Sequence, residues 1–300
     1  MSKERQADIR PLRANLDMSI WFLTSVRPRG TWTLSALSPD GKGGAPTATF
    51  IGEHEINLMR DWIKKMNKHA GVYFCANPTR ARMHKRPREQ DILAFQYAAL
   101  DFDPRKDESP ADCRKRVLAQ LREYKLKPTF VWSSGNGIQA MWRVKPVIML
   151  GNDRVTITRC KKATLGLIKA LGSDSTQSLE HLFRVPGTIN YPNKSKRAAG
   201  RTPVYASGFY HGAERTYTLK DFPKPRIKLV NEARGLTDPP GGWDTQAGIN
   251  DAMLYFQTTK DLAAEGRSGT AIRTARRARD YGVSPETAFA LMWEYWAPRL

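Results

Sequence analysis

Two aspartates, Asp101 and Asp103, are spaced so that both can bind the same cations. They lie in the segment Tyr97-Ala98-Ala99-Leu100-Asp101-Phe102-Asp103-Pro104. Residues two apart on a strand point to the same face, so we expect adjacent carboxylates at the end of a strand that Pro104 terminates. Carboxylates this close repel each other unless cations lie between them, and such oxygen ligands suit Mg²⁺ or Mn²⁺. Two ions about 3.5–4 Å apart activate an attacking hydroxyl and stabilise a leaving pyrophosphate. The alternative is an exposed aspartate pair in a loop.

A glycine turn, Ser133-Ser134-Gly135-Asn136-Gly137, follows between two apolar segments. Gly-Asn-Gly permits a tight turn whose backbone amides approach an anion closely. Asn-Gly is also the commonest signal of a plain β-hairpin, and a hairpin explains the glycines. It does not explain Gln139, a polar residue between apolar neighbours that is expected to face the same way as Met141 and Arg143.

Two further polar residues lie between positions 172 and 190. Asp174 follows a predicted helix and is either a third acid or a surface turn residue. Arg184 stands in the apolar segment Leu182-Phe183-Arg184-Val185, where a buried cation needs an anionic partner. That partner is either a nucleotide phosphate or a buried carboxylate of the protein, and both remain open.

The elements that must position these residues follow from periodicity and turn residues. Helices are predicted at 56–66, from the Ser109-Pro110 cap to about Tyr124, and from Asp153 to Leu171. Strands are predicted at Ser19–Val26, Thr31–Leu37, Val72–Ala76 and Phe95–Phe102, and a hairpin at Thr129–Ser133 and Ile138–Val144. The Pro- and Gly-rich residues 223–248 predict a linker, and 250–300 predict helices.

Several classes of protein are excluded by composition. Cys75, Cys113 and Cys160 lie far apart without zinc-ligand spacing, so we expect small buried thiols and neither a disulfide framework nor a zinc site. The run Gly41–Gly44 lacks the spacing and the preceding strand of a phosphate loop. No signal peptide is recognisable, and no apolar run approaches the ~20 residues of a membrane span. We therefore expect a cytoplasmic protein, in the host cytoplasm if a phage or plasmid encodes it.

The charge balance points to a polyanionic partner. The 300 residues include 49 Lys+Arg against 29 Asp+Glu, a formal net charge of +20. Basic groups placed on phosphates release condensed counterions, and the charge comes in runs, although a merely soluble basic surface is the alternative. The residues expected to contact DNA are Arg80, Arg82, Lys85, Arg86, Arg88, Lys194, Lys196 and Arg197.

Three segments together resemble the motifs of the archaeo-eukaryotic primase (AEP) superfamily: Leu100–Asp103, Ser133–Trp142 and Gly172–Asn190. They look most similar to the RepB-type plasmid primases and to the primase-polymerases of phages and mobile elements. The similarity covers roughly residues 70–220, with the motifs in the right order and at approximately the right spacing. Residues 265–294 also look similar to the helical domain that follows the catalytic domain in phage primases.

The family's motifs map onto this sequence position by position. Its acidic pair is matched by Asp101 and Asp103, and its third metal-binding acid by Asp174. Its second motif carries a Ser or Gly turn followed by His, or by Gln in the RepB-type branch, and Gln139 stands at that position. An RxPGTxN segment, here Arg184 to Asn190, follows in many relatives. The zinc-binding insertion of some relatives is absent.

The resemblance implies an α/β (α+β) fold with an RRM-like antiparallel sheet packed by helices. It places the catalytic domain in 1–222, a linker in 223–248 and a small all-helical domain in 249–300, with further sequence expected beyond it. It implies a primase-polymerase that uses two Mg²⁺ or Mn²⁺ ions, without zinc, to add (d)NTPs to a 3′-hydroxyl on single-stranded or primed DNA. A fused or separate helicase is a further candidate partner.

The resemblance also assigns roles to individual residues. The metal ligands and catalytic acids would be Asp101, Asp103 and Asp174. The residues that would contact the incoming nucleotide are Ser133, Ser134, Gly135, Asn136, Gly137, Gln139, Arg184 and Asn190.

Two other function classes remain as alternatives. A non-catalytic replication-initiator module that binds single-stranded DNA suits the net charge equally well. However, a pure DNA binder gains nothing from carboxylates that converge in a basic groove. A metal-dependent nuclease is the third class, and the similarity of the third motif disfavours it.

Overall fold

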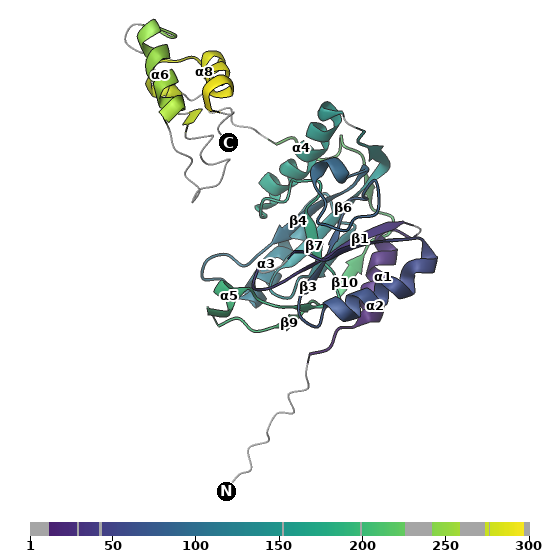
Figure 1. Ribbon diagram of the computed structural model, residues 1–300. Coiled ribbons are helices and arrows are strands. Elements are labelled where there is room, and N and C mark those ends of the chain that lie inside the picture. The colour runs from purple at the N-terminus through teal and green to yellow at the C-terminus, as the bar shows by residue number, and fades with distance from the viewer. Residues whose placement is uncertain are drawn as a thin grey trace. The chain divides into compact units, whose positions relative to one another are not determined.

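The computed structural model describes residues 12–28, 30–41, 44–151, 153–198, 200–225, 242–258, 274–275 and 277–296. The chain divides into two compact units, residues 1–226 and 227–300 (Figure 1). The first unit combines helices with antiparallel strands, which confirms the predicted α/β class.

Two sheets form the centre of the first unit (Figure 1). The four-stranded sheet has the order β2-β1-β3-β7, with bounds β1 Thr31–Leu37, β2 Thr47–Ile51, β3 Gly71–Cys75 and β7 Leu182–Arg184. The five-stranded sheet runs β10-β5-β6, and β6 also pairs with β4 and β11; its bounds are β4 Ala94–Phe102, β5 Phe130–Ser133, β6 Ile138–Met149, β10 Phe209–His211 and β11 Thr216–Tyr217. A separate two-stranded pair consists of β8 Ile189–Asn190 and β9 Val204–Tyr205.

Helices cover these sheets and connect their strands. The α-helices are α1 Leu16–Val26, α2 Ile56–Met66, α3 Pro110–Glu123, α4 Arg154–Leu171 and α5 Lys194–Ala198. Two short 3-10 turns, η1 Glu53–Glu55 and η2 Glu89–Asp91, complete the first unit.

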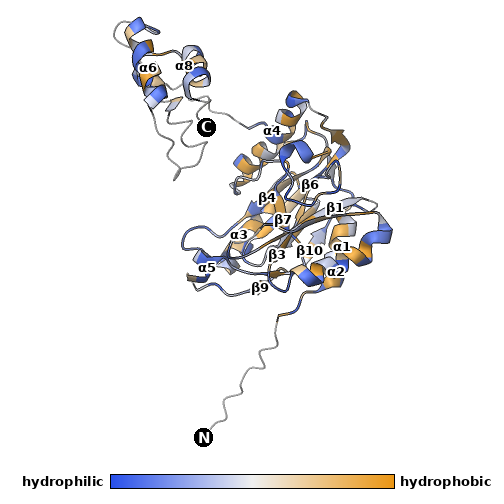
Figure 2. Ribbon diagram, viewed as in Figure 1, coloured by the Kyte–Doolittle hydropathy of each residue, from blue (hydrophilic) through white to orange (hydrophobic). Residues whose placement is uncertain are grey.

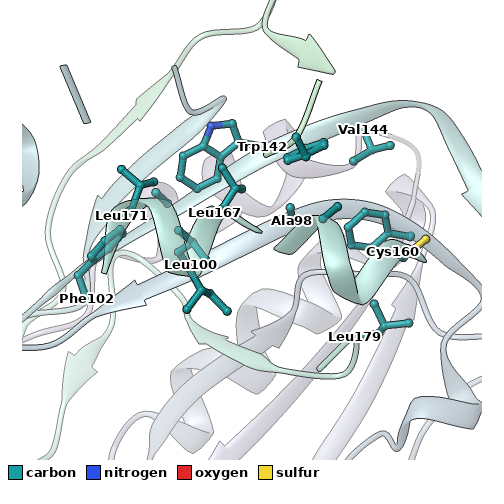
Figure 3. Close-up of a cluster of buried hydrophobic side chains, with 14 of the residues drawn as sticks. Ala98, Leu100, Phe102, Trp142, Val144, Cys160, Leu167, Leu171 and Leu179 are labelled. Atoms are coloured by element: carbon teal, nitrogen blue, oxygen red, sulfur yellow. The ribbon is translucent and has the colours of Figure 1, made fainter. Parts of the chain in front are cut away.

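One face of β4 packs against the helices. Ala98, Leu100 and Phe102 alternate along the strand and are buried in one hydrophobic cluster with residues of α3 and α4. Figure 3 shows Leu167 and Leu171 of α4 close to these strand residues. Figure 2 shows apolar colour along the central strands and a mixture of apolar and polar colour on helices such as α2 and α4.

The other face of β4 packs toward the four-stranded sheet. Tyr97 and Ala99 are buried there with Phe74 of β3 and Phe22 of α1. The rings of Phe22 and Phe74 meet edge to face, with centroids 5.3 Å apart, a favourable aromatic geometry. Continuing this alternation, the next two positions are Asp101 and Asp103. Strand geometry therefore places both carboxylates on the same side as Tyr97 and Ala99.

The segment 19–26 is a helix, and its predicted assignment as a strand is wrong. Its Ile, Trp, Phe, Thr and Val content favours a strand by propensity. Two features override that propensity: the Asn15 side chain caps α1 by accepting the backbone N–H of Met18 at 3.0 Å, and Phe22 and Val26 are buried at helical spacing.

The other predicted elements of the first unit are confirmed to within a few residues. In α3, Ser109 caps the helix by accepting the Asp112 backbone N–H at 3.1 Å, and Asp153 caps α4 in the same way. The hairpin is also confirmed, although β6 continues to Met149, beyond its predicted end.

The cysteines are free and buried, as predicted from their spacing: Cys75, Cys113 and Cys160. In the described part of the chain, no helix combines the length and the apolar character that a membrane span requires.

The second unit is helical where it is described. It contains α6 Gln246–Thr258, α8 Pro285–Leu291 and the π-helical turn η4 Met292–Trp296. Its own core includes Phe256, Val283 and Trp296. The predicted linker falls mostly on 226–241, outside the described residues, and its predicted end at 248 lies inside α6. The assignment of catalysis to residues 1–222 stays a prediction.

Candidate active site

A cleft of about 270 Å³ brings together several of the residues singled out in the sequence. Its lining includes six of the predicted site residues: Asp101, Asp103, Ser134, Gln139, Arg184 and Asn190. It also includes Lys196, which was predicted to contact DNA, and residues that were not predicted: Leu37, Ser38, Pro39, Tyr73, Tyr191, Pro192 and Asn193.

Asp101, which lines this cleft, has one carboxylate oxygen that is unsatisfied. Its Oδ1 atom is shielded from solvent and has no hydrogen-bond partner. Burial, followed by repulsion from Asp103 and Asp174, raises the pKa of Asp101 to about 7, although a hydrogen bond from Gln139 and the charge of Arg184 act in the opposite direction. A shielded carboxylate under this repulsion is stabilised by a cation, so its chemistry fits a divalent metal ion.

Gln139 on β6 links β4, which carries Asp101, to β7 through hydrogen bonds of its side chain. It lies opposite Asp101 in the β4–β6 register, and its side chain hydrogen-bonds the Asp101 carboxylate. Its Oε1 accepts the backbone N–H of Arg184 at 3.0 Å. With 2% of its surface exposed, Gln139 satisfies both ends of its amide within the protein. This explains the polar residue that a plain hairpin leaves unexplained.

Asp103 lies at the open side of the cleft. Its Oδ2 is 3.6 Å from the Lys196 ammonium, and both side chains are nearly half exposed, so the pair contributes little to stability. The glycine at 137 allows the hairpin to approach this strand end. A Cβ on Gly137 would lie 2.3 Å from the Phe102 carbonyl oxygen and 3.2 Å from Asp103 Oδ1.

Asp174 lies beside the acidic pair but does not line the cleft. Its backbone N–H donates to the Asp101 carbonyl at 3.0 Å, and its Oδ2 accepts the Asp103 backbone N–H at 3.1 Å. Within the described ranges, no group of three or more His, Cys, Asp or Glu side chains is arranged as a metal site. The structure therefore brings Asp174 next to Asp101 and Asp103 with its carboxylate turned to the backbone, and its role as a third ligand stays a prediction.

Arg184 is a buried cation with an unused donor. Only 6% of its surface is exposed, and burial lowers its pKa while Tyr73, Asp101 and Asp103 act to raise it. Its Nη2 donates to the Tyr73 hydroxyl, and its guanidinium lies 4.3 Å from the centroid of that ring. Nη1 has no partner. An unpaired guanidinium nitrogen in a cleft is suited to an oxyanion such as phosphate.

The position of Arg184 is fixed from several sides. Its carbonyl oxygen accepts the Trp132 indole N–H at 2.9 Å, and Gln139 accepts its N–H. A Cβ on Gly71 would lie 2.6 Å from Nη1, so glycine at this position leaves room for the guanidinium.

The glycine turn contributes fewer cleft residues than predicted. Ser134 lines the cleft and accepts the Gly137 N–H at 3.1 Å, and Asn190 donates to the Ser134 carbonyl at 2.8 Å. Ser133 instead accepts the Gly135 N–H at 3.1 Å. Four of the predicted turn residues do not line the cleft, and their contact with a nucleotide stays a prediction: Ser133, Gly135, Asn136 and Gly137.

The predicted DNA-contacting residues fall into two groups. On α5, Lys196 lines the cleft, while Arg197 donates to Asp40 and to the Pro192 carbonyl. In the basic loop, Arg82 pairs with Glu55 at 2.6 Å. The other predicted residues are Arg80, which donates to the carbonyls of Gln90 and Gly151, and the exposed Lys85, Arg86, Arg88 and Lys194. None of the loop residues lines the cleft, so their contact with DNA stays a prediction.

Tyr73 is the main site residue that the sequence analysis missed. It sits in the apolar segment Gly71–Cys75, and only its register opposite Arg184 reveals its role. A tyrosine at an alternating position of a short strand is a weak sign, because tyrosine is common in strands.

The protein has structural similarities but no sequence matches: no protein-family model and no curated protein matches it. The AEP domain of the cyanophage S-2L primase-polymerase is similar at 14% identity and a TM-score of 0.46, over 69% of this chain and 95% of that chain. The primase RepB′ is similar at 13% identity and a TM-score of 0.43, over 94% of this chain and 87% of that chain. The catalytic domain of primase RepB′ in complex with initiator DNA is similar at 13% identity and a TM-score of 0.40, over 69% and 89%.

Proposed function

We propose that this protein is a DNA primase-polymerase that transfers nucleotides from (d)NTPs to a 3′-hydroxyl on a DNA template, in phage or plasmid replication. The proposal rests on one observation. A single cleft contains a shielded oxygen of Asp101 that lacks a partner and a buried nitrogen of Arg184 that lacks a partner. The carboxylate is suited to a cation and the guanidinium to an anion, and a metal-bound triphosphate supplies both.

Asp101 and Asp103 would hold Mg²⁺ or Mn²⁺, with Asp174 as the predicted third ligand. When bound, such ions lower the pKa of an attacking hydroxyl and neutralise charge on the leaving pyrophosphate. Arg184 would bind a triphosphate oxygen through Nη1, and Gln139 would keep Asp101 and β7 in register. Lys196, half exposed beside Asp103, would exchange that carboxylate for a phosphate.

DNA binding is the second part of the proposal. The net charge of +20 supports a nucleic-acid partner, and the charge alone fits a non-catalytic initiator module equally well. The two functions differ in what the carboxylates do. A metal ligand is required for nucleotide addition, whereas an acid in a DNA-binding surface only repels phosphate.

The test pairs primer extension with DNA binding measured by fluorescence anisotropy, in Mg²⁺ and in Mn²⁺. Asp101→Ala and Asp103→Ala are each expected to abolish nucleotide addition, while DNA affinity stays the same or rises. Asp61→Ala on α2 is a matched control, because Asp61 is exposed and outside the cleft. Circular dichroism checks that each variant is folded.

Wild-type rates of extension in both aspartate variants would refute the catalytic assignment. A wild-type protein that binds DNA but adds no nucleotide with either metal would favour the initiator module instead.

A further inference from the structure

A second cavity, larger than the cleft, lies on the opposite face of the five-stranded sheet. Its volume is about 560 Å³. Ser133 and Ile138 line it, whereas their neighbours Ser134 and Gln139 line the cleft. Because successive strand residues face opposite sides, the β5–β6 hairpin separates the two cavities. We call this cavity the α3 groove; its remaining lining residues are Arg114, Leu118, Leu121, Arg122, Lys127, Pro128, Val131, Trp132, Ser207, Gly208, Phe209, Tyr210 and Arg215.

The floor of the α3 groove is apolar and carries one accessible aromatic ring. Leu118 and Leu121 of α3 and Val131 of β5 are among its lining residues. Tyr210 pairs with Val131 in the β10–β5 register, so both side chains stand on the groove side of the sheet. Tyr210 is 51% exposed, which leaves its ring available for stacking.

The rim of the α3 groove is positively charged. Its charged lining side chains are Arg114, Arg122, Lys127 and Arg215, and among the described residues that line it none is acidic. Arg215 is held in place, because its Nη1 donates to the Pro128 carbonyl at 3.2 Å and its guanidinium lies 5.1 Å from the centroid of the Tyr210 ring. A cation thus lies over one face of the ring, and a base would stack on the other face.

We propose that the α3 groove binds a single-stranded segment of nucleic acid, with a base stacked on Tyr210 and phosphates on the four rim cations. A positively charged groove with an aromatic platform is what binding of single strands requires. An acidic peptide satisfies the cations but offers a flat ring only where its sequence contains an aromatic residue, whereas every nucleotide of a single strand carries both a phosphate and a base. An apolar partner leaves four cations unpaired. The inference does not depend on polymerase activity, because the groove and the cleft are separate cavities.

The experiment measures binding of a labelled oligo(dT) 12-mer to the full chain by fluorescence anisotropy over a range of salt concentrations. The double variant Arg114→Gln/Arg122→Gln is compared with Lys162→Gln/Lys169→Gln, which removes the same charge from exposed positions of α4. We expect the groove variant to lose about tenfold in affinity. Its salt slope should fall by about 1.4, since each phosphate contact to a single strand contributes about 0.7. The α4 variant should stay within twofold of the wild type.

Stacking is tested separately with Tyr210→Leu, with Tyr210→Phe as the control that keeps the ring. The leucine variant should bind oligo(dT) about 5- to 150-fold more weakly, and it should bind an abasic oligomer of the same length as tightly as the wild type does. Equal losses in the two double variants, or a Tyr210→Leu variant with unchanged affinity, would overturn the proposal. Polyglutamate that binds as tightly as oligo(dT) and depends on Arg114 and Arg122 would assign the groove to an acidic peptide.

Discussion

Two arginines of the first unit are equally buried but differ in how many of their guanidinium nitrogens have hydrogen-bond partners. Arg27 and Arg184 are 5% and 6% exposed, and burial lowers the pKa of each. Arg27 donates from Nε to Gln96 Oε1 at 2.8 Å and from Nη1 to the Thr31 carbonyl at 2.8 Å. Its Nη2 donates to the carbonyls of Cys75, at 3.1 Å, and Ala76. Arg184 donates from its guanidinium to the Tyr73 hydroxyl, and its Nη1 has no partner.

The difference teaches that burial alone does not mark a functional arginine. A buried polar group needs partners, and the protein supplies them for every guanidinium nitrogen of Arg27. At Arg184, which lines the cleft, the protein leaves one guanidinium nitrogen, Nη1, without a partner. The missing partner is therefore expected to come from a ligand, and the two residues should respond differently to the same substitution.

The largest expected effect is on stability at Arg27. Arg27→Met removes the guanidinium and leaves acceptors at Gln96, Thr31, Cys75 and Ala76 without their donor. We expect a loss of about 3–5 kcal/mol in the free energy of unfolding, measured by urea denaturation. Arg184→Met, the matched substitution, should leave stability nearly unchanged, because it removes a buried charge that is only partly paired.

For nucleotide-addition activity we expect the reverse order, with the larger effect at Arg184. Arg184→Ala should lower kcat/KM for nucleotide addition by the equivalent of about 2–4 kcal/mol, as expected when a charge-assisted contact to a phosphate is lost. A stably folded variant with unchanged KM and kcat would assign Arg184 to structure, as Arg27 is, and the comparison would fail.

Asp101 extends the comparison to an acid in which one carboxylate oxygen, Oδ1, lacks a partner. Its pKa rises from the ordinary 3.8 to about 7 in the folded protein. Between these pH values the folded protein keeps a proton that the unfolded chain releases. The free energy of unfolding of the metal-free protein should therefore fall as pH rises from about 4 to about 7, by at most about 4 kcal/mol.

Urea denaturation at pH 5 and pH 8 measures this effect, with Asp101→Asn as the control. The asparagine variant should lose the pH-dependent contribution and be the more stable protein at pH 8. Adding Mg²⁺ at pH 8 should stabilise the wild type and have little effect on the variant. Identical pH dependence in the two proteins would contradict the raised pKa.

Local patterns in the sequence predicted the parts of the site that depend on one element. The alternation along β4 placed Asp101 and Asp103 on one face because strand geometry is local. The helix α1 was missed because its β-prone residues are held in a helix by packing against other elements. Arg27 and Arg184 could not be distinguished by sequence, since the acceptors of Arg27 include backbone carbonyls about 50 residues away in the chain.

Asp174 combines a structural contact, as at Arg27, with a predicted ligand contact, as at Arg184. Its Oδ2 already accepts the Asp103 N–H, as a structural residue would, yet the sequence motif predicts a metal ligand. If it only positions β4, Asp174→Asn keeps an acceptor oxygen and should retain activity to within about threefold, while Asp174→Ala should lose about tenfold. If Asp174 binds metal, both variants should lose extension activity to the same extent. The Mn²⁺ concentration required for half-maximal extension should then rise in both.

The smallest expected effect comes from the glycine beside the unpaired donor. Gly71→Ala places a methyl group where the Cβ lies 2.6 Å from Arg184 Nη1 and 3.1 Å from the Tyr73 ring. The guanidinium must therefore shift from its present position, which alters the contact that we assign to the triphosphate. We expect the nucleotide KM to rise about tenfold, equivalent to about 1.4 kcal/mol, with kcat nearly unchanged.

Gly30→Ala is the matched control, because a Cβ there would lie 2.5 Å from the Cβ of Arg27. It should lower the free energy of unfolding without changing the nucleotide KM of the folded fraction. A Gly71→Ala variant that loses stability and keeps its KM would mean that Arg184 serves the scaffold in the same way as Arg27. A raised KM at unchanged stability would locate the nucleotide contact at Nη1, since that is the atom the added methyl group meets first.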